Sequence, residues 1–250
     1  MHVLLERLQV VYKRGRQHVH SPDPDYVEKL AYVDEVINQA RASYGQIVAL
    51  YQDELTFYRQ PTLAKAYEEQ GHKQPLAELS YSSNTKSRVV ATLDVLSGRV
   101  LYERRSVLHI DDLIAFYRKV RRGYPDAQRI YVILDNWPVH FHPDLLHALE
   151  PQELRWPLRR PPLWPEEPSD RARKHWRQGS LPIQLVQLPT YAPWTNPVEK
   201  LWRKLFQEVL HVHRMANQLP QLREMVDKFL AQFANGSDAL LKYVGLLKPS

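Results

Sequence analysis

Residues 130–136 read Ile-Tyr-Val-Ile-Leu-Asp-Asn, five apolar side chains followed by two polar ones. An uninterrupted apolar run of this length is typical of a central strand that is covered on both faces. We therefore expect Ile130–Leu134 to form the middle of a sheet, with Asp135 and Asn136 at its carboxyl end.

Other short apolar runs precede and follow this strand along the chain. Gln46–Gln52 reads as a buried strand that ends at Asp53–Glu54, and Ile183–Leu188 reads as another short strand. Residues 88–105 contain two β-branched runs around Ser97–Gly98, which is the pattern of a hairpin.

Segments with helical periodicity lie before, between and after these strands. Apolar residues recur at helical spacing over 26–43, over 110–122, from Pro197 to about residue 213, and from Pro220 to Phe233. The second of these helices begins on acidic residues and is followed by Gly123, which we expect to be its C-cap. The order of strands and helices predicts a mixed α/β fold, with helices on both faces of a small sheet.

Residues 151–180 interrupt this pattern. They contain six prolines, three tryptophans and seven Lys/Arg against four acids, with no helical or strand period. We interpret the segment as a basic insertion. Its Trp156, Trp164 and Trp176 either form a DNA-binding surface with the basic residues or pack against the core.

Composition limits the possible functions. The chain has 250 residues and no cysteine, which excludes disulfides, thiolate metal sites and thiol nucleophiles. Its net charge of +6 favours a polyanionic partner. The sequence shows neither an apolar run of the roughly 18 residues that a spanning helix needs nor a signal-peptide layout, so we expect a soluble, intracellular protein that does not contact a membrane.

Three acids occupy the positions where α/β proteins place their sites. Asp53 and Asp135 follow strands, and Glu199 lies in the first turn of a helix after the last strand. Ligands of open α/β sheets bind beyond the carboxyl ends of the strands. Three carboxylates there would suit two Mg²⁺ or Mn²⁺ ions about 3.5–4 Å apart, as in phosphodiester chemistry.

Structural roles compete with this interpretation. Either aspartate can serve a turn, and Glu54 can replace Asp53 as the ligand because strand alternation sends only one of them toward the site. Glu199 can close a capping box on Asn196. His140 is either a group that orients water or phosphate or a surface histidine, and His211 with His213 makes a poor metal pair because they point to different helix faces.

Four segments carry a resemblance to a known family. QDELTFYRQPTLA (52–64), SNTKSRVVATLD (83–94), YVILDNWPVHFHP (131–143) and LPTYAPWTNPVEKLWRKL (188–205) resemble DDE-type transposases of mariner-like bacterial insertion sequences. The match runs from about residue 12 to residue 215.

The resemblance implies a ribonuclease H-like catalytic domain at 46–215, with 151–180 inserted. Carried over by motif, Asp53, Asp135 and Glu199 are the catalytic and metal-binding acids, and Asn136, His140 and Asn196 support them. Two Mg²⁺ or Mn²⁺ ions are the implied cofactors. Residues 1–20 correspond to the tail of a helix-turn-helix region, 21–45 to a linker and helix, and 216–250 to C-terminal helices.

We therefore expect a transposase catalytic domain that cleaves double-stranded DNA at element ends and joins it to a target. Its expected location is the cytoplasm, on the nucleoid. A homodimer, or a partner that supplies a DNA-recognition domain, is expected. The residues expected to bind DNA phosphates are basic: Arg118, Lys119, Arg121, Arg122, Arg159, Arg160, Arg171, Arg173 and Lys174. The alternatives are a non-catalytic transposase remnant and a nuclease for RNA hybrids or branched DNA.

Overall fold

A single mixed sheet organises the chain, whose computed structural model describes residues 20–43, 45–157 and 160–247. The five strands lie in the order β3-β2-β1-β4-β5. The pairs β1–β2 and β2–β3 are antiparallel, whereas β1–β4 and β4–β5 are parallel. The strands are β1 (Ile47–Tyr58), β2 (Lys86–Asp94), β3 (Val100–Arg105), β4 (Arg129–Leu134) and β5 (Ile183–Gln187).

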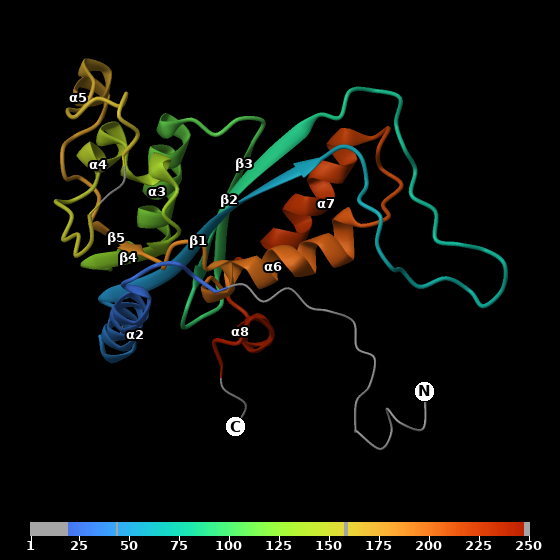
Figure 1. Ribbon diagram of the computed structural model, residues 1–250, viewed down its shortest axis with the longest axis horizontal. Helices are drawn as coiled ribbons and strands as arrows, with labels where there is room; N and C mark the ends of the chain where they lie inside the picture. Colours follow the sequence, from blue (N-terminus) through green and yellow to red (C-terminus); the bar gives the residue numbers. More distant parts are fainter. Residues whose placement is uncertain (1–19, 44, 158–159, 248–250) are drawn as a thin grey trace, which may run out of the picture.

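Helices cover both faces of this sheet, as the sequence predicted (Figure 1). One face packs against α2 (Tyr26–Ala42), α6 (Val198–Leu205), α7 (Leu219–Ala231) and α8 (Asp238–Val244). The other packs against α3 (Ile110–Gly123) and α4 (Pro143–Ala148), with α5 (Asp170–His175) beside α4. Short turns of other helix types are η1 (Pro138–Phe141), η2 (Pro193–Thr195) and the π-helical η3 (Phe206–Leu210).

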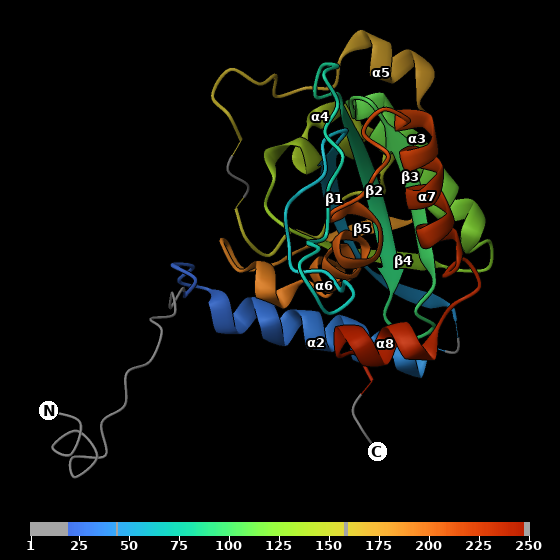
Figure 2. The same ribbon diagram turned by 90° about the vertical axis from the view of Figure 1, so that its right-hand side faces the viewer.

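Alternate residues of each strand belong to the cores on opposite faces of the sheet. In β1, Ala49 and Tyr51 belong to the core under α2 and α6, whereas Val48 and Leu50 belong to the core under α3. Successive side chains of a strand point to opposite faces, so this assignment fixes where the acids further along β1 point. Figure 2 shows the same layers from the side, with α2 and α8 both below the strands.

Strand β1 is longer than the sequence indicated. It continues to Tyr58, so Asp53 and Glu54 lie inside the strand rather than at its end. The reason is its two different neighbours: pairing with β4 stops at Tyr51, but pairing with β2 continues to Tyr58. Both acids therefore lie just beyond the point where the parallel half of the sheet ends.

Two helix ends and the insertion also differ from the prediction. The C-cap of α3 is Tyr124, and Gly123 is instead a close-packed position, because a Cβ there would lie 2.9 Å from Leu101 Cδ1. The helix from Pro197 becomes a π-helix and ends at Leu210, and Val212 lies outside it with φ of 50°. In the insertion, of which residues 151–157 and 160–180 are described, one short helix forms, α5.

The predicted helix-turn-helix tail at 1–20 lies, except for its last residue, outside the described residues. The described helices include none that is long and apolar enough to cross a membrane.

Candidate active site

Asp53 points to the face of the sheet that α6 covers. Its carboxylate accepts a hydrogen bond of 2.9 Å from the indole Nε1 of Trp202 in α6. The next residue, Glu54, contacts His140, which follows β4. Strand alternation thus separates the two neighbouring acids, as predicted, and Asp53 is the one that lies beside Glu199.

Asp135 directly follows β4, at the parallel half of the sheet. Its Oδ1 accepts the backbone N–H of Trp137 at 3.0 Å, and the side chain remains 60% exposed. The neighbouring Asn136 turns inward, where its Nδ2 donates to the carbonyl of Leu188 at 2.6 Å. Because Leu188 follows β5, this bond ties the ends of two adjacent parallel strands together.

Glu199 does not form the capping box that was considered for it. The backbone N–H of Asn196 donates to the carbonyl of Pro193. The Asn196 side chain accepts the amide of Val198 at 3.2 Å and donates to the carbonyl of Gln52 at 2.9 Å. Asn196 therefore connects the first residue of α6 to β1, and the Glu199 side chain lines the cavity beside the sheet.

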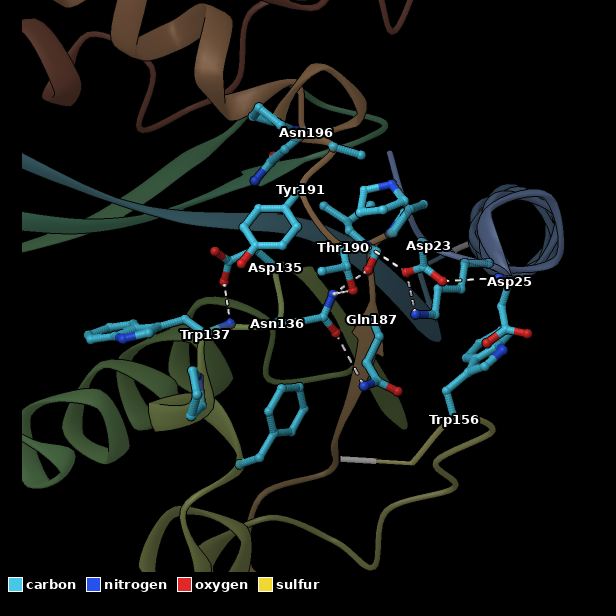
Figure 3. Close-up of a pocket in the computed structure, with 18 of the residues that line it drawn as sticks. Asp23, Asp25, Asp135, Asn136, Trp137, Trp156, Gln187, Thr190, Tyr191 and Asn196 are labelled. Atoms are coloured by element: carbon cyan, nitrogen blue, oxygen red, sulfur yellow. Dashed lines mark hydrogen bonds and ion pairs between the residues drawn. The ribbon is translucent and has the colours of Figure 1, made fainter. Parts of the chain in front are cut away.

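One cavity brings the three predicted acids together. It has a volume of about 880 Å³, and Asp53, Asp135 and Glu199 all line it. Figure 3 shows Asp135, Asn136 and Asn196 around it, with Gln187 and Trp137 on the side of the β4 and β5 ends. The supporting residues Asn136 and Asn196 also line this cavity.

The negative charges in the cavity affect one another. Burial, followed by the neighbouring carboxylates of Glu199 and Glu54, raises the pKa of Asp53 to about 8. Burial and the carboxylate of Asp135 likewise raise the pKa of Glu199. Like charges that cannot be well solvated disfavour ionisation, so a cation would stabilise this arrangement.

His140 is buried, which corrects the expectation of a surface histidine. It is 1% exposed, and its Nε2 lies 3.4 Å from Glu54 Oε2 and 3.6 Å from Asp135 Oδ1. Burial alone lowers the pKa of a histidine, but the carboxylates of Glu54 and Asp135 outweigh this and raise it. The imidazole thus links an acid of β1 to the acid after β4, a contact that the sequence did not reveal.

The side chains fit a divalent ion by their chemistry. All three acids offer carboxylate oxygens, which Mg²⁺ and Mn²⁺ prefer. Within the described ranges, however, no three His, Asp or Glu side chains are gathered closely enough to hold an ion as they stand. His211 and His213 have other partners, since Thr62 contacts the first and the amide of Met215 donates to the second.

The predicted DNA-binding residues lie mainly on α3 and α5. On α3, Arg121 donates to the carbonyls of Tyr124 and Ala127, and Lys119 donates to that of Tyr102. The guanidinium of Arg118 lies over the ring of Trp176. Arg171 pairs with Asp111, and Arg173 pairs with Glu167 and Asp170. Arg122, Arg160 and Lys174 are exposed. Arg159 lies outside the described residues.

The tryptophans of the insertion all contact the rest of the domain. Trp156 packs against the core under α2, where its ring lies tilted against that of Tyr32, and Trp176 packs against the core under α3. Trp164 packs edge-on against His142. These contacts favour the structural role that was considered for the three rings.

The sheet order, with acids from β1, the end of β4 and the start of α6 on one cavity, defines a ribonuclease H-like fold with an acidic site. Solved structures support the fold. The Mos1 mariner paired end complex with Mn aligns with a TM-score of 0.58 and 17% identity over 98% of this chain and 65% of the other. The Mos1 transposase paired-end complex with left transposon end aligns with a TM-score of 0.54 and 16% identity, over 96% of this chain and 64% of the other.

Sequence comparison identifies the family. The profile described as DDE superfamily endonuclease matches residues 48–223, so this chain belongs to that family. It is also similar to the insertion element IS630 uncharacterized 39 kDa protein of Shigella sonnei, with 20% identity over 236 residues. That match covers 93% of this chain and 59% of the relative, so the chain spans a little over half of the relative's length. The resemblance seen in the sequence is thereby confirmed.

Proposed function

We propose that this chain is the catalytic domain of a transposase, which cleaves DNA phosphodiester bonds at the ends of an insertion sequence and joins the freed 3′-hydroxyl to target DNA. The observation that carries the proposal is the cavity shared by Asp53, Asp135 and Glu199 in a chain of the DDE endonuclease family. Family membership implies polynucleotidyl transfer, and the acids supply the groups for it.

The three acids are proposed to hold two Mg²⁺ or Mn²⁺ ions. When bound, such ions activate an attacking hydroxyl and stabilise the leaving oxygen. In the protein, Trp202 orients the carboxylate of Asp53, and Asn196 fixes the start of the helix that carries Glu199 to β1. His140 contacts both Asp135 and Glu54 and so connects the end of β4 to β1.

The proposed substrate is double-stranded DNA. The Mos1 structures that share this fold are paired-end complexes, one of them with a transposon end, which supports DNA ends as substrate and a dimer as the working unit. The chain's net charge of +6 agrees with a polyanionic partner. A DNA-recognition domain from a partner or from additional sequence is part of the same proposal.

The test is metal-dependent nicking of supercoiled plasmid by the 250-residue chain, with and without Mn²⁺. We expect Asp135→Asn to lower the nicking rate by about 10³-fold, an order of magnitude typical of losing an essential electrostatic group, while DNA binding measured by fluorescence anisotropy is retained. Asp126→Asn, at the opposite end of β4, is exposed and serves as the matched control.

Two outcomes would contradict the proposal. Nicking that persists in Asp135→Asn would place the chemistry elsewhere. An unmodified chain that binds DNA but does not cleave it in the presence of Mn²⁺ would favour a non-catalytic, regulatory role.

A further inference from the structure

The segment before α2 is fixed in place, although the sequence indicated a turn or linker there. Asp23 is 9% exposed, and its Oδ2 accepts hydrogen bonds from Lys29 Nζ at 2.7 Å and from the backbone N–H of Thr190 at 2.6 Å. Its Oδ1 accepts the amide of Asp25 at 3.0 Å, and the hydroxyl of Ser21 donates to the carbonyl of Thr190. Residues 21–29 are thus bound to the loop after β5.

These bonds continue from Thr190 toward the candidate active site. Asn136 Nδ2 lies 3.4 Å from Thr190 Oγ1, and Gln187 Nε2 donates to Asn136 Oδ1 at 3.3 Å. Figure 3 shows this series of contacts running from Asp23 through Thr190 to Asn136 and Gln187 across one side of the cavity. Asn136 is the residue next to the second acid, Asp135.

The same segment also forms a wall of the cavity. Pro22, Asp23, Asp25 and Lys29 line it together with the three acids. A buried charge is tolerated only when its partners satisfy it, and Asp23 has both a cation and backbone donors. Burial raises the pKa of this carboxyl, but the bonds from Lys29 and from the amides of Thr190 and Asp25 outweigh burial and lower it to about 2.

We propose that Asp23 is a positioning residue of the active site, acting through Thr190 and Asn136 on the location of Asp135. The inference rests on the proposed function, because Asp135 is taken there as a metal-binding acid. Its consequence is that residues 21–29, which precede the catalytic sheet, control how well the second acid is placed. A change in this segment would reach the site without any contact to DNA.

Hydrogen exchange of the full chain tests the connection independently of catalysis. The amide of Thr190 donates to Asp23, and the amide of Trp137 donates to Asp135. We expect Asp23→Asn to speed exchange by about tenfold both in the peptide that contains the Thr190 amide and in the peptide that contains the Trp137 amide, as loss of a charged hydrogen bond would. Faster exchange at 188–192 with no change at 135–137 would overturn the proposal.

Plasmid nicking tests the effect on the site. We expect Asp23→Asn to raise the Mn²⁺ concentration for half-maximal nicking by about tenfold, the size seen for groups that orient metal ligands, and to leave the rate at saturating Mn²⁺ nearly unchanged. A merely structural role would instead lower the amount of active protein at every Mn²⁺ concentration. That result, or an unchanged Mn²⁺ requirement, would count against positioning.

Two further variants keep the test decisive. Thr190→Val removes the hydroxyl that faces Asn136 but retains the amide that binds Asp23, so it should raise the Mn²⁺ requirement even if Asp23→Asn folds poorly. Asp34→Asn removes the same charge from an exposed position of α2 that does not line the cavity, and should leave the requirement unchanged. If the unmodified chain does not nick DNA at all, the proposed function fails while the exchange experiment still decides whether Asp23 and Asp135 are connected.

Discussion

Two adjacent acids, Asp53 and Glu54, have different roles because a strand sends them to opposite faces. The sequence predicted this separation but left open which of them faces the site. The structure places Asp53 beside Trp202 and Glu199, and Glu54 against the buried His140. Glu54 also accepts a bond of 3.0 Å from the buried Gln52. Glu54 therefore contacts His140 from the face of the sheet opposite Asp53.

Substitution of each acid should separate these roles. We expect Asp53→Asn to abolish Mn²⁺-dependent nicking, because it removes a carboxylate from the cavity. Glu54→Gln should reduce nicking by about tenfold, since groups that orient metal ligands typically contribute roughly 10- to 100-fold. Single-turnover rates at saturating Mn²⁺ measure both effects. Equal losses in the two variants would argue that Glu54, too, contacts the metal.

At the scale of the elements, the turn between β2 and β3 packs against the start of α8. Gly98, in the predicted β2–β3 hairpin, has φ of 67°, and a Cβ there would collide with the backbone carbonyl oxygen of Ser237 at the start of α8. The hairpin turn is therefore a packing site for the C-terminal helix as well as a tight turn. The sequence indicated the turn, but contact with a helix so distant along the chain could not be read from it.

Replacing this glycine should be costly. We expect Gly98→Ala to lower the free energy of unfolding by about 3 kcal/mol, combining left-handed backbone strain with overpacking. Gly45→Ala is the matched control, because Gly45 has φ of 91° but, chain neighbours aside, no atom of the described residues lies within 4 Å of the position that a Cβ would take. It should cost about 1 kcal/mol, the strain alone. Urea denaturation measures both, and equal losses would refute the packing contact.

Helix α2 should be attached to the site in a pH-dependent way. Because the pKa of Asp23 is lowered from 3.8 to about 2 in the folded chain, its stabilising effect is complete above about pH 4 and disappears as the pH falls through 2. The difference in unfolding free energy between the unmodified chain and Asp23→Asn should therefore shrink by about 2 kcal/mol between roughly pH 5 and pH 2. Denaturation at several pH values measures it. A constant difference would mean that Asp23 is not held as described.

For the molecule as a whole, the order of strands and helices could be predicted, but the contacts between distant segments could not. The apolar run at 130–134 identified the central strand, and the Asn-Pro-Val-Glu motif located the helix of Glu199. Periodicity describes one segment at a time, so it missed the length of β1, which depends on β2. For the same reason it missed the burial of His140 between Glu54 and Asp135, and the bond from Asp23 to Thr190.

The proposed DNA surface is also a property of the whole molecule, because α3 and α5 contribute to it together through the Arg171–Asp111 pair and the Arg118–Trp176 contact. Arg122 and Lys174 are exposed on these two helices. If both contact DNA phosphates, Arg122→Ala combined with Lys174→Ala should weaken binding and reduce the slope of log affinity against log salt by about two. Fluorescence anisotropy over a range of NaCl concentrations measures this slope.

Arg121 provides the control within the same helix. Its guanidinium donates to the carbonyls of Tyr124 and Ala127 at 2.7 and 2.9 Å, which holds the end of α3. Arg121→Ala should therefore lower the free energy of unfolding by about 1 kcal/mol and leave the salt slope nearly unchanged. If the double variant keeps the original slope, Arg122 and Lys174 do not contact DNA phosphates. If Arg121→Ala reduces the slope, Arg121 contacts a phosphate in the DNA complex instead of only holding the end of α3.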